Sequence, residues 1–167
     1  MNSKRYISIS DARRFIKASS SQMKELSKSG AIQKVENLAV GIRSLKEHYD
    51  FMSVIKYAAK QNTVNVATYC FGHSAEDALQ SLMSMDDSLK ALGLSWLYSY
   101  VDYDASELRG LYHLFDAIND KSTKLCLILT NVDLQTCLDE EVFKKLMVAA
   151  SEKNVMIMTM KELMEMM

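Results

Sequence analysis

An α/β fold is predicted by two features of this sequence. From residue 62 onward, apolar stretches of strand length alternate with longer stretches that have helical spacing. Residues 1–61 are different, because they contain short helix candidates and an excess of basic side chains. Alternating strands and helices joined by short loops are typical of a parallel sheet with helices on its faces. The sequence therefore predicts two domains, 1–61 and 62–167, the second with a mainly parallel four-stranded sheet flanked by helices.

Composition is typical of a globular protein. The 167 residues are 49% hydrophobic, which is enough for a real core, and no stretch approaches the roughly 20 apolar residues of a membrane span. The cysteines Cys70, Cys126 and Cys137 are odd in number and lack metal-ligand spacing. We therefore expect a reduced, intracellular protein of the cytoplasm with no metal site, no cofactor and no membrane partner.

The net charge of -1 hides a strong asymmetry. Residues 1–60 hold 12 Lys and Arg against 5 Asp and Glu, a balance of +7, and the remainder holds 8 against 16, a balance of -8. Such a distribution indicates an N-terminal domain that contacts a polyanion, although two halves that attract each other would show the same pattern.

Two capped helices are predicted near the N-terminus. Ser8 and Asp11 have capping-box spacing ahead of a helix over 9–17, and Ser19 and Gln22 repeat it ahead of a second helix. Gly30 stands where a helix C-terminus favours a left-handed residue. Two short helices joined by so brief a turn predict a helix-turn-helix, whose second helix enters the major groove of DNA.

A hairpin, or wing, and a third helix complete this predicted domain. The hairpin would join residues 32–35 to residues 40–43, and the third helix would span 50–60. The expected phosphate contacts are the basic residues Arg13, Arg14, Lys24, Lys28, Lys34 and Arg43. The expected base-reading side chains are Ser20, Ser21 and Gln22.

The run YISISDARRFIKASSSQMKELSKSGAIQKV, followed by GIR and a closing helix, resembles the MerR-type winged helix-turn-helix. Phe15, Met23 and Gly30 match core and cap positions of that pattern, and Leu26 replaces its frequent tryptophan. The resemblance implies that double-stranded DNA is the partner. A generic three-helix bundle is the alternative.

The second domain is predicted to contain four strands, at 63–69, 95–101, 124–130 and 155–160. Its helices are expected at 75–91, 104–119, 139–153 and 161–167. The acidic residues at 102, 104 and 107 could hold a metal, but we interpret them as favouring a helix N-terminus.

This domain is similar to the catalytic domain of serine recombinases of the resolvase/invertase type, and the order of the two domains resembles small transposon-encoded recombinases. The matching pieces are Tyr69-Cys70, Arg109-Gly110-Leu111 and the run 133–137. The resemblance implies a serine that attacks a DNA phosphate, arginines that stabilise the developing charge, and an oligomer.

The chain departs from that family where the chemistry would occur. Phe71 stands at the arginine position after the first strand, His73 at the serine position, and Ser74 one residue late. The run Asp133-Leu134-Gln135-Thr136-Cys137 lacks both arginines of the second cluster, so only Arg109 matches an active-site arginine. The resemblance therefore implies a retained resolvase-like fold, used for self-association, without strand cleavage.

Three functional hypotheses follow. The first is a sequence-specific DNA-binding regulator or architectural protein that self-associates into a homo-oligomer. The second is an active recombinase that uses Ser74 and Arg109. The third is a small α/β module that binds a nucleotide or a protein, although the single glycine of the first turn, Gly72, gives no support for a phosphate loop.

Overall fold

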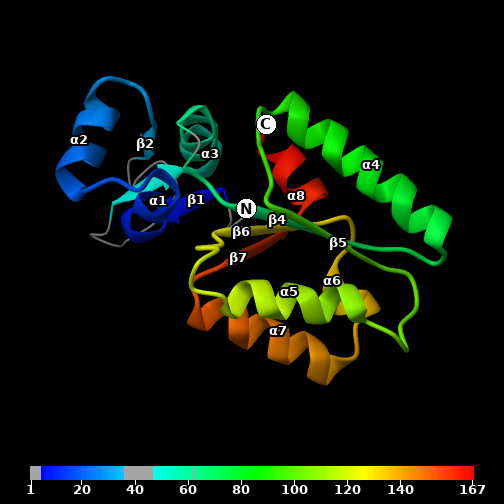
Figure 1. Cartoon of the computed structure of the whole chain (residues 1–167). Helices are drawn as coiled ribbons and strands as arrows, with labels where there is room; N and C mark the ends of the chain where they lie inside the picture. The colour runs from blue at the N-terminus through cyan, green and yellow to red at the C-terminus, as the bar shows by residue number, and fades with distance from the viewer. Residues whose placement is uncertain (1–4, 36–46, 62) are drawn as a thin grey trace. The chain divides into compact units, whose positions relative to one another are not determined.

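The computed structural model describes residues 5–35, 47–61 and 63–167. The chain divides into two compact units, one formed essentially by residues 1–64 and the other by residues 65–165 (Figure 1). Each unit has its own sheet and its own core, and each is described by itself.

The first unit contains a small antiparallel sheet and three helices. The strands are β1 (Tyr6–Ser8), β2 (Lys34–Val35) and β3 (His48–Asp50), in the order β1-β3-β2. The helices are α1 (Ile9–Ile16), α2 (Ser20–Lys28) and α3 (Phe51–Lys60). Strands β1 and β3 were not predicted. The predicted return strand of the wing, residues 40–43, lies outside the described residues.

The predicted caps of α1 and α2 are confirmed. The Ser8 Oγ accepts a hydrogen bond from the Asp11 backbone N–H at 3.2 Å. At α2, the Ser19 Oγ accepts from the Gln22 N–H at 3.2 Å, and the Gln22 side chain accepts from the Ser19 N–H at 2.8 Å. Gly30 adopts a φ of +79°, which allows the chain to leave α2 through the left-handed region. The N-caps of α1 and α2 and the glycine that follows α2 therefore lie where the sequence predicted them.

Apolar faces of all three helices form the core of this unit. The rings of Phe15 in α1 and Phe51 in α3 pack edge to face, with centroids 5.8 Å apart. Met23 of α2 is fully buried. Leu26 and Ser27 are partly buried, and the remaining residues of α2 are exposed.

The second unit is an α/β layer structure, as predicted. Strands β4 (Val66–Phe71), β5 (Tyr98–Asp102), β6 (Leu127–Thr130) and β7 (Met156–Thr159) form one parallel sheet in the order β5-β4-β6-β7. Helices α5 (Arg109–Asn119) and α7 (Glu140–Glu152) cover one face, and α4 (Ala75–Ala91) and α8 (Met160–Glu165) cover the other (Figure 1).

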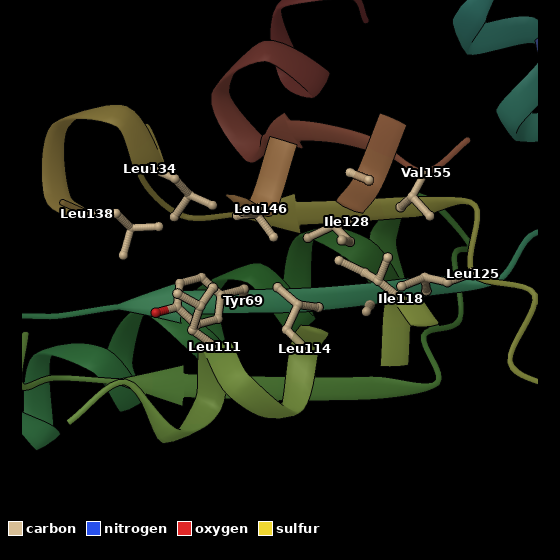
Figure 2. Packing of buried hydrophobic residues seen from close by; sticks show 12 residues of the cluster. Tyr69, Leu111, Leu114, Ile118, Leu125, Ile128, Leu134, Leu138, Leu146 and Val155 are labelled. Atoms are coloured by element: carbon tan, nitrogen blue, oxygen red, sulfur yellow. The ribbon is translucent and has the colours of Figure 1, made fainter. Parts of the chain in front are cut away.

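The main core of this unit lies between the sheet and the α5–α7 layer. Tyr69 and Ile128 from the sheet meet Leu111 and Leu114 of α5 and Leu146 of α7 (Figure 2). All five side chains are buried. On the opposite face, α4 packs its buried positions against the sheet, where the Cys70 Sγ lies 3.2 Å from the Met85 Sδ. Cys70 is fully buried and therefore a core residue, and this burial raises the pKa of its thiol to about 12.

The start of one helix differs from its prediction, and one short helix was not predicted. Helix α5 begins at Arg109 rather than at residue 104, because the Asp104 carboxylate accepts hydrogen bonds from the backbone and hydroxyl of Ser106 and forms a separate turn. The short helix α6 (Leu134–Cys137) was not predicted, and Asp133 caps it. Within the described residues, no helix has the length and apolar character needed to cross a membrane.

Candidate nucleic-acid interface and the carboxyl edge of the sheet

One side of α2 consists of exposed residues. Ser20, Ser21, Lys24 and Lys28 are all exposed, and their spacing places them along one side of the helix. A helix that is buried through one narrow stripe and exposed elsewhere has the shape needed to enter a groove. The structure thus brings four of the predicted DNA-binding residues onto one surface.

Gln22 lies on a different side of α2. Its side-chain oxygen is occupied by the Ser19 N–H in the capping box. It also lines a cavity of about 420 Å³ together with residues of α1 and α3, among them Ile16 and Tyr57. Its role as a helix cap therefore competes with the predicted role of reading a base.

Three of the predicted phosphate-binding cations already have partners inside the unit. The Arg13 Nε donates to the Ala18 carbonyl at 3.0 Å, and Arg14 forms an ion pair with Asp11. Lys34 pairs with Glu47 at 3.2 Å, and this hydrogen bond lowers the pKa of the Glu47 carboxyl. Arg43 lies outside the described residues. Among the described residues, neither Lys24 nor Lys28 forms an ion pair within 4.0 Å, although the charge of Lys24 also helps to lower the pKa of Glu47.

In the second unit, strand β4 is followed by a tight turn at Gly72. The Asn131 side chain, just beyond β6, accepts from the Phe71 N–H and donates to the Phe71 carbonyl, both at 2.9 Å. The Asn131 amide therefore continues the hydrogen bonding between β4 and β6 beyond their last backbone pair, Tyr69 and Thr130. A Cβ on Gly72 would lie 2.5 Å from the Ala78 backbone nitrogen. Glycine is therefore needed for α4 to begin so close to the strand end.

Ser74, the candidate nucleophile, serves as the N-cap of α4. Its Oγ accepts from the Asp77 N–H at 3.1 Å, while the His73 N–H donates to the Asp77 carboxylate at 2.9 Å. Both bonds stabilise the first turn of the helix. An attack on phosphate would require the Ser74 hydroxyl to act while it accepts this capping bond.

An open cavity of about 600 Å³ adjoins this turn. Its lining comes from the ends of β4, β6 and β7 and from one side of α4: Phe71, His73, Asp77, Gln80, Ser81, Ser84, Met85, Asn131, Val132 and Met160. This set contains a carboxylate and an imidazole, and it includes neither lysine nor arginine. Phosphoryl transfer requires fixed positive charge around the phosphate, so the lining as described does not suit that reaction.

Arg109 occupies the first position of α5, and its side chain is 82% exposed. Its guanidinium lies 3.6 Å from the Glu107 carboxylate. It does not belong to the lining of the cavity beside Ser74. The structure therefore does not gather the two predicted catalytic residues around one described cavity.

A buried carboxylate, Asp102, lies at the end of β5, and it is one of the acidic residues that the sequence predicted to favour a helix N-terminus. Asp102 accepts hydrogen bonds from the Tyr69 hydroxyl and from the backbone N–H groups of Gly110 and Leu111, each at 2.8 Å. Burial, together with the Asp102 carboxylate, raises the pKa of Tyr69. The contact of Asp102 with the start of α5 confirms the predicted role at a helix N-terminus, whereas its bond to Tyr69 was not predicted.

A solved recombinase domain is similar to part of this chain. It is the crystal structure of the C-terminal catalytic domain of ISC1926 TnpA, an IS607-like serine recombinase. The match has a TM-score of 0.47 and 19% sequence identity, and it covers 61% of this chain and 76% of that chain. No protein-family model matches the sequence, and no curated protein matches it either.

Proposed function

We propose that this protein binds double-stranded DNA through α2 and that its second unit is an α/β body that does not cleave DNA. The observation that carries the proposal is the pair α1 and α2, capped at Ser8 and Ser19 and joined by a turn of three residues, 17–19. This is the arrangement in which the second helix of a helix-turn-helix enters the major groove.

The exposed side of α2 supplies both kinds of contact that recognition needs. Lys24 and Lys28 would bind phosphates, and Ser20 and Ser21 near the start of the helix would contact base edges. The excess of positive charge in residues 1–60 would attract the duplex before contact. The resemblance of this region to MerR-type domains supports the same assignment.

The second unit supports binding rather than strand cleavage. Ser74 is occupied as a helix cap, Phe71 and His73 stand where the family pattern has arginine and serine, and the adjoining cavity is lined without a cation. Removal of a single donor from a preorganised charge-stabilising site costs roughly 100- to 1,000-fold in rate. The absence of several such groups favours a protein that occupies DNA and leaves both strands intact.

Selection from a random-sequence duplex pool tests the proposal. The full chain is expected to enrich a preferred sequence. The Ser20→Ala/Ser21→Ala variant should bind with similar strength at low salt and lose the preference, because serine side chains supply hydrogen bonds to bases. A Ser122→Ala variant, altered in an exposed loop of the second unit, serves as control. Failure of the wild-type chain to retain any duplex at low salt would overturn the proposal.

A further inference from the structure

Three aromatic rings form a stack at one edge of the sheet in the second unit. The rings of Tyr98 and Tyr100 in β5 lie 6.0 Å apart at an interplanar angle of 26°, and the Tyr100 ring lies 6.5 Å from the His113 ring of α5 at 18°. Tyr98 is 41% exposed, and His113 is exposed as well. The β5 edge surface consists of these three residues and of Ser99, Val101 and Asp116.

The backbone of β5 is open for pairing on its outer side. Among the described residues β5 pairs with β4 alone, because it is the edge strand in the order β5-β4-β6-β7 (Figure 1). The Gly72 N–H donates to the Asp102 carbonyl at 3.0 Å, so the backbone groups of Asp102 point towards β4. Backbone direction alternates along a strand, and Ser99 and Val101 therefore direct their N–H and C=O groups outward.

Strand β5 lacks the features that usually protect an edge strand. It contains neither lysine nor proline, and its residues Tyr98 and Ser99 are exposed. By contrast, β7 at the opposite edge contains no exposed residue. An unprotected strand edge is a template for pairing with another chain. Strand β5 is therefore the edge to which a further strand can be added.

The charge around β5 indicates which kind of chain fits there. Residues 98–120 hold five Asp and Glu against one Arg. Asp116 lies one turn from His113 on α5, is exposed and has no ion-pair partner within 4.0 Å among the described residues. Burial, with smaller contributions from Tyr98 and Asp116, raises the pKa of Tyr100, which places this carboxylate near the stacked rings. Exposed tyrosine rings and an unpaired carboxylate both favour a cationic side chain.

We propose that the β5 edge surface binds an extended, basic peptide segment of another protein by strand addition. The added strand would exchange backbone hydrogen bonds with Ser99 and Val101, and alternate side chains would lie over Tyr98 and Tyr100. Lysine or arginine at those positions would contact the rings and Asp116. A nucleic acid strand or a second copy of β5 fits less well, because each would bring further negative charge to an acidic edge. The site lies within the second unit and does not depend on DNA binding through α2.

Fluorescence anisotropy of a labelled seven-residue peptide, in which valine and arginine alternate, tests the site on the full chain. The peptide is expected to bind, and the same peptide with glutamate in place of arginine is not. Tyr98→Ala and Asp116→Asn should each weaken binding about two- to fivefold, since each removes one contact of the cation. Met147→Ala on α7, where Met147 is 42% exposed, and Asp87→Asn on α4 are the matched controls. Equal binding of the two peptides, or equal affinity of Tyr98→Ala and Met147→Ala, would overturn the proposal.

Methylation of alternate peptide nitrogens tests strand addition itself. Only every second N–H of an added strand faces β5, so one peptide is methylated on its valine nitrogens and another on its arginine nitrogens. One of the two should bind at least about tenfold more weakly than the other, because several backbone hydrogen bonds are lost together. Equal affinities of the two methylated peptides would contradict strand addition. Circular dichroism of each protein variant checks that the fold is intact.

Two further measurements distinguish the other possible occupants. Sedimentation of the wild-type chain and of Tyr98→Ala detects a second copy at β5, and anisotropy of a labelled oligothymidine detects a nucleic acid strand. Neither property should differ between the wild type and Tyr98→Ala. Self-association or oligothymidine binding that Tyr98→Ala abolishes, with peptide binding unchanged, would assign the β5 edge surface to that occupant and overturn the proposal.

Discussion

The Tyr69 hydroxyl donates a hydrogen bond of 2.8 Å to the Asp102 carboxylate, and both residues are buried. Tyr69 belongs to β4, Asp102 ends the neighbouring strand β5, and the same carboxylate accepts two backbone N–H groups at the start of α5. One acidic side chain therefore links two strands and a helix. A negative charge at a helix N-terminus is also favoured by the helix dipole.

Tyr69→Phe is expected to destabilise the protein by about 1.5–3 kcal/mol, because a hydrogen bond to a charged, buried acceptor is lost without a replacement by water. The measurement is the free energy of unfolding from urea titration. Tyr112→Phe, at an exposed position, should change stability by less than about 0.5 kcal/mol. Equal stability of the two variants would show that the Tyr69–Asp102 bond is unimportant.

Gly72→Ala is expected to destabilise the second unit by about 1–3 kcal/mol, since the added Cβ would meet the backbone of α4. Thermal unfolding followed by circular dichroism measures the change. Ser95→Ala, at an exposed residue of the loop before β5, provides a small-residue control. A Gly72→Ala variant as stable as the wild type would indicate that α4 does not begin so close to the turn.

Several elements of the fold could be predicted from local sequence because their ends are chemically marked. Helix α4 has the predicted bounds, 75–91, since Ser74 provides the N-cap and the chain leaves the helix through Gly93, with a φ of +72°. The Ser8 N-cap of α1 and the Ser19/Gln22 capping box of α2 were recognisable for the same reason. Strands β1 and β3 contain three residues each, too few for an alternating pattern to be visible.

The contacts that define the sheet edge could not be predicted. The bonds between Asn131 and Phe71 join residues 60 positions apart, and the Tyr69–Asp102 bond joins residues 33 positions apart. Such contacts depend on the order of strands, which periodicity does not reveal. The exposed side of α2 was easier to predict, because one helix contains all of its residues.

Asp86→Asn is expected to stabilise the protein at pH 7. One oxygen of the Asp86 carboxylate is enclosed and has no hydrogen-bond partner among the described residues, and burial raises the pKa of this carboxyl. A pKa that is higher in the folded state means that stability declines as the pH rises through that pKa. The advantage of the amide should therefore disappear below about pH 4, where the acid is also neutral in the unfolded chain.

Unfolding titrations at pH 7 and pH 3 measure this difference. Asp87→Asn, at the adjacent and exposed position, is the control and should show a smaller effect. A lower stability of Asp86→Asn than of the wild type at pH 7 would mean that the Asp86 carboxylate is favourably solvated.

No covalent protein–DNA adduct is expected from the wild-type chain incubated with a duplex that the selection experiment enriches, because Ser74 caps α4 and no lysine or arginine among the described residues lines the adjoining cavity. Denaturing electrophoresis of labelled duplex detects such an adduct. Ser74→Ala should leave duplex binding unchanged and reduce stability by about 1 kcal/mol, the usual contribution of a helix cap. An adduct formed by the wild type and absent from Ser74→Ala would establish the recombinase hypothesis instead.

The most direct measurement of the central claim is the salt dependence of duplex binding, followed by fluorescence anisotropy of a labelled duplex. Each of Lys24→Ala and Lys28→Ala should reduce the slope of log affinity against log salt concentration by about 1, because each removes one phosphate contact. Lys145→Ala, at an exposed position of α7, should leave the slope unchanged. Absence of duplex binding by the wild-type chain at low salt, or an unchanged slope in the Lys24→Ala/Lys28→Ala variant, would contradict DNA binding through α2.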